Sequence, residues 1–472
     1  MGGRYKFSVD LSVKNSGVTG NLCMISVHRK EGDVKFLVDC GMFMEDNRDA
    51  LNAAKFDFKP ENIDFMLATH IHADHTGRIP LLYKRGFYGV TYCSEDTANM
   101  MRYALTDNVK ILGIVAKFLS TKPLYTERDV EYTLANVTSK PFYETFEPVS
   151  GVKVTLFKNA HLIGAAMILV QISSEGEEDI NLFFMGDYNK KNKFFDVPEL
   201  PEWVKKLPLH VICESTYGAV DSFESKKPVF RDNIENWVNS GKKTIIIPTL
   251  SLGRYQEIAY ILKTMQDSGK ISTSIPIWFE GNLAIKYTNA FKNFLDISPT
   301  MRDFMPASGN FVTDRAAVMA SKEQKIVVTT SGGADFGPAP EYVSRFIGDP
   351  NACFHFTSYL WKDCLGKRIL DTPLFGSVSV QNVLMTKRAE VKTTSEFSGH
   401  ARRDEMAKFL AKFKDLRVLY VTHGEPEVRE AFGKYCQENC RLKNIAITGT
   451  GYTFRMNTYG IIKSICEKPM ID

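Results

Sequence analysis

Three histidines and one aspartate fall within six residues, in the segment THIHADHTGRIP that spans residues 69–80. The apolar run at 62–68 predicts a buried strand before them, and the run at 79–82 predicts the start of a helix after them. The cluster is therefore expected on a loop at the carboxyl end of a strand, where open α/β sheets bind their ligands. Imidazole and carboxylate together suit zinc or another first-row divalent metal. We predict a metal site here and not a set of surface histidines.

The spacing within this cluster suggests two metals. The first two histidines are two residues apart and point the same way in an extended segment, whereas Asp74 and His75 lie past the bend and could face a second metal. Two ions need more ligands than one segment supplies, and His161 and Asp187 are the natural candidates. An aspartate between two metals can bridge them. A water held by both would be a hydroxide near neutral pH, able to attack a phosphodiester or an acyl group.

Other polar side chains follow apolar runs in the same manner, namely Asp39, Glu214, His400 and His423. Strand ends in one sheet converge on one edge, so residues that are distant in sequence can meet there. The remaining histidines have ordinary contexts. His28 and His210 are expected in the core or on the surface, and His355 is expected to be a buried histidine with satisfied hydrogen bonds.

Length and composition are those of a globular protein. The 472 residues allow two or three domains, with 44% apolar and 24% charged residues. No segment approaches the roughly 20 apolar residues of a membrane span, and the N-terminus lacks the apolar stretch of a secretory signal. Nine scattered cysteines without a CxxC pair fit a reducing cytoplasm. The formal charge of +4 is too small to indicate nucleic-acid binding by itself.

Strand and helix patterns alternate along the whole chain, and the pattern begins again near residue 207. The block after it reads as a doubly wound α/β unit of its own. Helices are expected at 94–120, 254–266, 283–294 and 427–437. Strands are expected at 152–161, 167–172, 180–185, 209–213, 243–248, 275–279, 325–329, 353–359, 417–421, 444–456 and 460–466.

The order of these polar residues resembles a known family. One aspartate, the histidine-rich cluster, a further histidine and a second aspartate look like the four sequential motifs of the metallo-β-lactamase fold. Three later residues look like motifs A, B and C of its β-CASP branch, which comprises nucleases of RNA maturation and DNA repair. In order they are Asp39, His70, His72, Asp74, His75, His161 and Asp187, then Glu214, His400 and His423.

Membership of this branch implies an αββα sandwich with an inserted, doubly wound β-CASP domain. The sandwich would comprise residues 1–206, completed by 397–472, and the insertion would comprise 207–396. The inserted domain would cap the metal site, and nucleic acid would enter between the two. The chain is similar to the cleavage and polyadenylation endonuclease and to ribonuclease J-like enzymes. It resembles their short, bacterial-type form, without the KH domain and the C-terminal dimerisation domain of some relatives, although a homodimer remains possible.

The resemblance also implies a role for each residue. The first zinc would be bound by His70, His72 and His161, the second by Asp74, His75 and His423, and Asp187 would bridge them. Mn2+ is an alternative to the two Zn2+ ions. Asp39 would hold the site in order through the metal-bound water or through the ligand histidines. Glu214 would pair with His400, and the pair would act as general acid toward the leaving oxygen.

Contacts to the substrate are less specific. The glycine-bearing segment with Ser331 and Gly332 could offer backbone N–H groups to a phosphate. Arg254, Lys367 and Arg402 could contact the RNA backbone, although a solvated surface position fits each of them as well. The segment 363–368 departs from the family pattern, which places its local substrate contacts in question but not the metal ligands.

The expected function is a zinc-dependent ribonuclease that cuts single-stranded RNA and leaves a 5′-phosphate and a 3′-hydroxyl. His423 favours RNA, since RNA-acting members of the family tend to carry histidine in motif C and DNA-repair members valine. The alternatives are a DNA nuclease on the same scaffold, a binding module without catalysis, and a small-molecule hydrolase of lactams or thioesters. Whether cutting is internal or proceeds from the 5′ end stays open.

Overall fold

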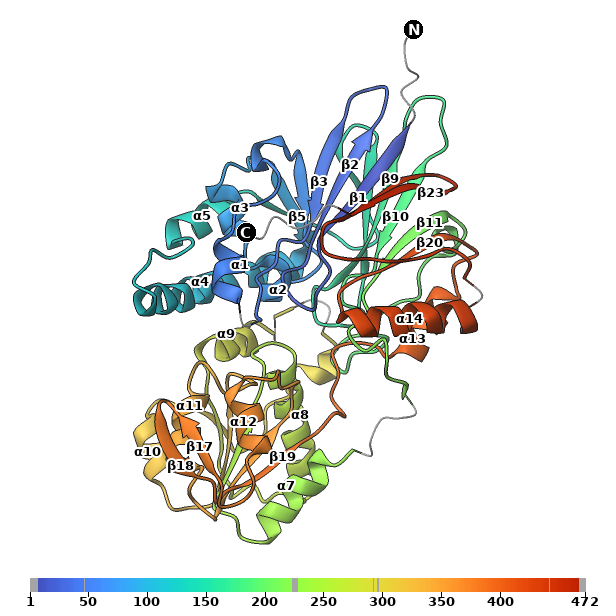
Figure 1. Ribbon diagram of the computed structural model, residues 1–472. Helices are drawn as coiled ribbons and strands as arrows, with labels where there is room; N and C mark the ends of the chain where they lie inside the picture. Colours follow the sequence, from blue (N-terminus) through green and yellow to red (C-terminus); the bar gives the residue numbers. More distant parts are fainter. Residues whose placement is uncertain are drawn as a thin grey trace. The chain divides into compact units, whose positions relative to one another are not determined.

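The structure is a computed structural model (Figure 1) that describes residues 7–45, 47–222, 228–291, 293–294, 297–440 and 442–466. The chain divides into two compact units. Unit 1 comprises the described residues within 1–192, 196–223 and 399–472, and unit 2 those within 193–195 and 224–398. The predicted family boundaries at 206/207 and 396/397 remain a proposal. By packing, the chain stays with unit 1 beyond residue 207, because strand β11 (Pro208–Cys213) pairs there with β10 and β20.

Unit 1 contains two sheets packed face to face. The first has the order β23-β22-β1-β2-β3-β4-β5-β6 and the second β21-β20-β11-β10-β9-β8-β7. The first comprises β1 (Ser8–Asn15), β2 (Leu22–His28), β3 (Val34–Val38), β4 (Phe65–Leu67), β5 (Val90–Ser94), β6 (Val137–Lys140), β22 (Tyr452–Asn457) and β23 (Gly460–Cys466). The second comprises β7 (Thr145–Val149), β8 (Val152–Lys158), β9 (Ala166–Ile172), β10 (Ile180–Phe184), β11, β20 (Asp415–Val421) and β21 (Ile445–Ile447).

Alternation along the strands produces the core between these sheets. Val9, Leu11 and Val13 of β1 are buried in one apolar cluster with Val152 and Val154 of β8. Successive residues of a strand point to opposite faces, and the other face of the second sheet forms a separate cluster with helices. Its members include Leu169, Phe183, Val211 and Leu419 from the strands, with Phe409 and Phe432 from α13 and α14.

Helices cover the outer faces of both sheets (Figure 1). Helices α3 to α5 lie beside the first sheet, and α13 and α14 beside the second. The layers therefore follow the predicted αββα order. The helices of unit 1 are α1 (Arg48–Ala53), α2 (Ala73–Thr76), α3 (Ile79–Lys84), α4 (Glu95–Phe118), α5 (Glu127–Ala135), α6 (Glu202–Lys205), α13 (Arg403–Leu410) and α14 (Pro426–Asn439), with a 3-10 turn at Pro60–Asn62. Among the described residues, no helix combines the length and the hydrophobicity needed to cross a bilayer.

Unit 2 contains a six-stranded parallel sheet with the order β14-β13-β15-β12-β16-β19, and a separate hairpin of β17 and β18. The strands are β12 (Thr244–Pro248), β13 (Ile277–Phe279), β14 (Gly309–Phe311), β15 (Lys325–Thr329), β16 (Ala352–Phe356), β17 (Ser377–Val380), β18 (Val383–Thr386) and β19 (Glu390–Thr393). The helices are α7 (Phe230–Asn239), α8 (Arg254–Asp267), α9 (Asn282–Phe291), α10 (Arg315–Ala320), α11 (Ala339–Phe346) and α12 (Leu365–Asp371), with a 3-10 turn at Pro299–Met301.

The helices of unit 2 cover both faces of this sheet. Tyr342 of α11 is buried in one cluster with Ile246 and Val327 of the central strands. On the opposite face, Tyr255 of α8 packs against Phe279 of β13, with ring centroids 5.6 Å apart. Helices on both faces of a parallel sheet define a doubly wound unit, which confirms the predicted fold class.

Two local predictions were wrong. The run at 444–456 is not one strand but two, β21 in the second sheet and β22 in the first. Gly451, with a φ of 81°, lies in the turn that carries the chain between them. The segment predicted to bind metal is also not a loop throughout, since Asp74 and His75 lie on the one-turn helix α2. Its first two backbone hydrogen bonds depend on the carbonyl of His72, which accepts from His75 and Thr76 at 3.0 Å each.

Helix α2 is fixed in place by the loop that follows β3. The backbone N–H groups of Cys40 and Met42 donate to the carbonyls of His75 (2.7 Å) and Ala73 (2.8 Å). Gly41 lies between them, so close to α2 that a Cβ atom there would be 1.5 Å from the carbonyl oxygen of Asp74. No side chain fits at this position unless α2 moves.

We therefore expect Gly41→Ala to lower the free energy of unfolding by about 1–3 kcal/mol or more, the usual cost of overpacking a buried contact. Urea denaturation measures this. The matched control is Gly113→Ala in α4, where an added Cβ meets nothing within 4 Å. That change should raise the free energy of unfolding by roughly 0.5–1 kcal/mol, because glycine is a poor helix former. Equal stability of both variants would contradict the close packing of α2.

Candidate metal centre

The polar residues singled out by the sequence lie in unit 1, just after strands that end at the same edge. Asp39 follows β3, and His70 follows β4. In the second sheet, the parallel strands β10, β11 and β20 are followed by Asp187, Glu214 and His423. Because the two sheets are packed against each other, these strand ends bring their side chains to one place.

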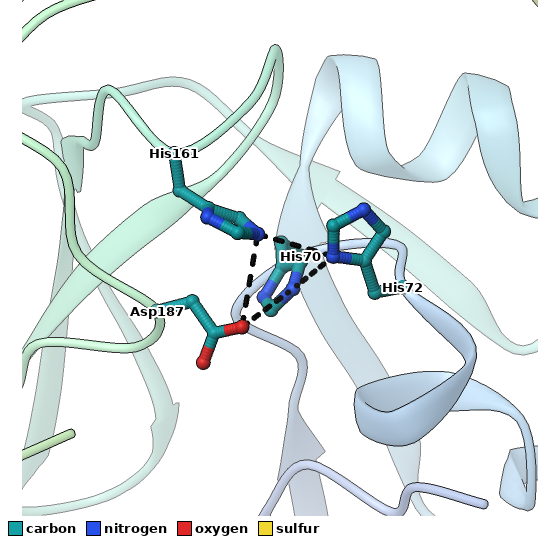
Figure 2. A group of neighbouring side chains, drawn as sticks. All are labelled: His70, His72, His161 and Asp187. Atoms are coloured by element: carbon teal, nitrogen blue, oxygen red, sulfur yellow. Dashed lines mark hydrogen bonds and ion pairs between the residues drawn. The ribbon is translucent and has the colours of Figure 1, made fainter. Parts of the chain in front are cut away.

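The first group of possible ligands is formed by His70, His72, His161 and Asp187 (Figure 2). One ring nitrogen of each histidine and one carboxylate oxygen lie within 4.8 Å of one another. Nδ1 of His72 is 3.1 Å from Nε2 of both His70 and His161. Oδ2 of Asp187 is 3.6 Å from Nε2 of His70 and 3.7 Å from Nε2 of His161. Three imidazoles and a carboxylate around one point are a donor set that zinc accepts.

The second group is formed by Asp74, His75, His423 and again Asp187. Oδ1 of Asp187, the oxygen that faces away from the first group, is 3.2 Å from Nε2 of His75 and 3.6 Å from Nε2 of His423. Oδ2 of Asp74 is 3.6 Å and 3.8 Å from the same two nitrogens. Asp187 thus presents one oxygen to each group.

Three of these atoms have no hydrogen-bond partner among the described residues although they are buried: Nε2 of His75, Nε2 of His423 and Oδ1 of Asp187. A buried polar atom without a partner costs free energy. All three belong to the second group and lie close together, so a cation there would satisfy them at once. The residues present fit a metal.

The other ring nitrogens are held by neighbouring acceptors. Nδ1 of His75 donates to Asp39 Oδ2 (2.8 Å), Nδ1 of His161 donates to the carbonyl oxygen of Gly399 (2.7 Å), and Nδ1 of His423 donates to Thr216 Oγ1 (3.1 Å). A donating Nδ1 carries a proton, so Nε2 is the ring nitrogen that faces the group. Metal-binding histidines are usually oriented in this way. Burial disfavours a charge on His75 and His423, but Asp187 outweighs it and raises the pKa of both, so a cation bound there would displace a proton from Nε2.

Asp39 is itself held in place. It is fully buried, and it accepts hydrogen bonds from the backbone N–H of Thr69 and from Thr69 Oγ1, both at 2.8 Å. The sequence left two routes open for Asp39, the ligand histidines and a metal-bound water. The structure shows the contact with a histidine, His75, and the route through water stays a prediction.

The protonation states of His70, His161 and Asp187 suit metal binding. Burial lowers the pKa of His70 and His161 well below the ordinary value, so both are neutral and able to coordinate. Burial disfavours the charge on Asp187, but His423 and His75 outweigh it and hold its pKa well below the usual range. Asp187 is therefore a carboxylate.

His400 and Glu214 form a pair beside the two groups. Nδ1 of His400 lies 2.8 Å and 2.9 Å from the two carboxylate oxygens of Glu214, and its Nε2 lies 3.8 Å from Asp187 Oδ2. Glu214 also accepts hydrogen bonds from the backbone N–H groups of Tyr188 and Thr216. Burial opposes a charge on His400, but the attraction of Glu214 and Asp187 is stronger and raises its pKa to about 9.

The predicted RNA contacts are not part of this cluster. Arg254, Ser331, Gly332 and Lys367 belong to unit 2. Arg254 is ion-paired with Glu257 (3.0 Å), and Lys367 with Asp371 (2.7 Å). Arg402 belongs to unit 1, where its guanidinium lies 6.0 Å from the ring centre of Tyr217. Their role in binding RNA remains a prediction.

Sequence reasoning missed three supporting residues, Asn21, Thr69 and Thr216. Nδ2 of Asn21 lies 3.3 Å from Nδ1 of His75, and its backbone N–H donates to the carbonyl of Asp74 (2.9 Å). Thr69 and Thr216 each sit next to a histidine nitrogen. Thr69 and Thr216 adjoin the recognised motifs, which is a signal that could have indicated them. Asn21 follows a turn near the N-terminus and carries no such signal.

Comparison with protein families gives three matches along the chain. Residues 20–150 match the metallo-beta-lactamase superfamily, residues 255–369 match the Beta-Casp domain, and residues 385–446 match the Zn-dependent metallo-hydrolase RNA specificity domain. Together they include the histidine-rich cluster, much of unit 2, and His400 with His423.

Curated relatives match most of the chain. The transcription termination factor FttA of Methanococcus maripaludis is 27% identical over 431 residues, which are 86% of this chain and 65% of that protein. Ribonuclease TTHA0252 of Thermus thermophilus is 28% identical over 435 residues, which are 89% of this chain and 94% of that protein. This chain therefore spans about two thirds of the archaeal factor and nearly all of the ribonuclease.

A solved structure supports the fold. A protein of unknown function from Enterococcus faecalis matches with a TM-score of 0.55 and 12% identity, over 95% of this chain and 100% of that one. Identity this low supports the fold alone. The family is shown by the three consecutive family matches and the curated relatives. The chain belongs to the β-CASP branch of the metallo-β-lactamase superfamily.

Proposed function

We propose that this protein is a metal-dependent ribonuclease that hydrolyses phosphodiester bonds of single-stranded RNA. The observation that carries this function is the sharing of Asp187 between two possible ligand groups, with the charged pair of His400 and Glu214 beside it. Two adjacent cation sites with a proton donor next to them suit the displacement of an oxygen from phosphorus.

The first cation would be held by His70, His72 and His161, the second by Asp74, His75 and His423, and Asp187 would give one oxygen to each. Nitrogen-rich sites of this kind favour Zn2+, and Mn2+ is the alternative. When bound, the cations would supply charge stabilisation for the phosphate and a nucleophilic water at neutral pH. Asp39, Gly399 and Thr216 keep the imidazoles oriented.

His400 acts as the general acid. Nδ1 of His400 donates to Glu214, and its Nε2 lies on the side of Asp187, where it carries the second proton of the charged ring. With a pKa of about 9, the ring is protonated at neutral pH and can give this proton to the departing 3′ oxygen. Water adds to phosphorus as the P–O3′ bond breaks, so the products are a 5′-phosphate and a 3′-hydroxyl.

RNA is favoured over DNA by two comparisons. Residues 385–446, which contain His400 and His423, match a domain named for RNA specificity. Ribonuclease TTHA0252 matches over 94% of its own length. The alternatives are a DNA nuclease and a hydrolase of lactams or thioesters on the same scaffold.

We expect Asp187→Ala and His423→Ala to abolish cleavage of single-stranded RNA and to lower the bound zinc, since each removes a ligand. Gel analysis of 5′-labelled RNA and DNA, with metal content by mass spectrometry, measures both effects. His28→Ala is the control, because His28 pairs with Asp10 on β1 and does not belong to either group. If both site variants cut RNA as fast as the parent, the mechanism is wrong.

The same assay compares substrates. If DNA alone is cut, the protein is a DNA nuclease and not a ribonuclease. RNAs with monophosphate, triphosphate or hydroxyl 5′ ends separate internal from 5′-end cutting in the same assay.

We expect His400→Ala to slow cleavage by about 10²–10⁴-fold while zinc content stays unchanged, because the residue moves a proton and holds no metal. The rate should also fall with rising pH once His400 loses its proton, at or below about pH 9. Glu214→Gln removes the charge that raises this pKa, so the fall should begin at a lower pH. Rate profiles between pH 5 and 10 measure this. An unchanged alkaline limb in Glu214→Gln would contradict the assignment.

We expect Asp39→Asn to weaken zinc binding by about 10–100-fold, because it loses the charged acceptor of a metal-binding histidine. Competition with a coloured chelator measures the affinity. Asp10→Asn is a matched control, since Asp10 makes a comparable ion pair with His28 (3.1 Å) away from the site. Equal zinc affinity in all three proteins would show that Asp39 does not support the metal ligands.

A further inference from the structure

Large apolar side chains are exposed at one edge of the sheet in unit 2. Tyr359, three residues after β16, is 76% exposed, Leu250 after β12 is 46% exposed, and Phe336 in the loop after β15 is 39% exposed. The three strands are neighbours in the order β15-β12-β16 and run parallel, so the three loops leave the same edge. We call Leu250, Phe336 and Tyr359 the edge surface.

Contacts between the loops keep the edge surface together. A Cβ atom on Gly332 would lie 2.9 Å from Oγ of Ser358 and 3.4 Å from a methyl carbon of Leu250, so the backbone of the β15 loop touches both of the other loops. Within that loop, the backbone N–H of Ser331 donates to the carbonyl of Phe336 (3.0 Å), and the N–H of Phe336 donates to Ser331 Oγ (3.2 Å). The loop is therefore closed and presents Phe336 at its end.

The chain leaves β12 and β15 in opposite directions along the sheet, toward β13 and toward β16. Helix α8, after β12, and helix α11, after β15, pack on opposite faces of the sheet. Doubly wound sheets bind their ligands in the crevice between two such strands. Two hydroxyl groups lie at these strand ends. Thr249 directly follows β12 and Thr329 ends β15; both are fully buried, and their hydroxyls have no hydrogen-bond partner among the described residues.

The chemistry of the edge surface fits an unpaired base. An exposed aromatic ring offers a flat face on which any base can stack, and such stacking tolerates every sequence. Lys362, three residues beyond Tyr359, is exposed and makes no ion pair in the part of the chain that the structure describes, so it is available to a phosphate. Aromatic and cationic side chains together are typical of single-strand binding surfaces.

Building on the ribonuclease function proposed above, we propose that the edge surface is a stacking site for the bases of single-stranded RNA, with Tyr359 as its main platform. The occupant is RNA and not a protein, because two aromatic rings, those of Phe336 and Tyr359, are exposed on loops of one sheet edge and an exposed cation, Lys362, follows in the same loop as Tyr359. The edge surface binds the strand independently of its base sequence. It therefore raises the affinity for the substrate and does not affect the chemical step.

Binding of a fluorescent 12-nucleotide RNA to the full chain tests this, with His400→Ala in all proteins so that cleavage is slow during the measurement. Loss of one stacked base corresponds to about 5- to 150-fold weaker binding, and we expect this for Tyr359→Ala. Tyr359→Phe keeps the ring and should bind within about twofold of the parent. Tyr88→Ala is the matched control, since Tyr88 is 73% exposed in unit 1, and it should bind like the parent.

A second RNA of the same length with abasic positions distinguishes stacking from other effects. The difference between Tyr359 and alanine should disappear with it, because there is no base to stack. Equal binding of the normal RNA by Tyr359→Ala and the parent would overturn the proposal, as would an equal loss with the abasic strand. Sedimentation of the same variants completes the test. If Tyr359→Ala changes only the oligomeric state, the edge surface is a protein contact and the proposal fails.

Failure of the stacking site can be told apart from failure of the ribonuclease function. If the parent cleaves RNA but Tyr359→Ala binds it equally well, only the stacking site is wrong. If the parent never cleaves RNA, the proposed function is wrong, and the binding comparison still reports on Tyr359. In the active enzyme, Tyr359→Ala should raise KM with kcat unchanged, which is the signature of lost uniform binding.

Discussion

The burial of Asp187 is the constraint on which the candidate site depends. A carboxylate that is only 3% exposed must be compensated, because an isolated charge costs far more in the interior than in water. In this chain the compensation comes from imidazoles on every side, and two of them remain without a partner on their inward nitrogen. Removing any one of them would leave the carboxylate less well balanced. The charge of Asp187 and the protonation of the surrounding imidazoles therefore depend on one another.

This requirement links distant parts of the sequence. Asp187 follows a strand of the second sheet, whereas the cluster around His70 follows a strand of the first, so the site exists only when the two sheets are packed. His400 and His423 come from the last part of the chain and enter the same place. The carbonyl of Gly399 binds the ring of His161, which fixes where the chain must return after unit 2. The αββα core and the site therefore form together.

The gathering of the motif residues in one place was easier to predict from the sequence than the local structure around them. Histidine and aspartate after apolar runs are local signals, and parallel strands bring them together without any further information. The pairing of residues 444–456 was not predictable in the same way, because two short strands of different sheets and one longer strand have the same apolar pattern. Helix α2 was missed since four residues are too few for a helical period, and its position depends on the tertiary contact with Gly41. Asn21 was missed because its role lies in distances and not in spacing.

The charge of the candidate site also explains why substrate affinity and the chemical step would depend on different parts of the chain. The candidate metal centre is built around buried carboxylates such as Asp187, which offer nothing attractive to a phosphate backbone until cations are present. The chain as a whole carries only +4, and several of its basic side chains, including Arg254 and Lys367, are already paired with acids. Nucleic-acid affinity that rests on charge alone falls steeply with salt. Stacking on an aromatic face does not depend on ionic strength in this way, so a surface such as that of Tyr359 is where a weakly charged member of this family can hold a single strand.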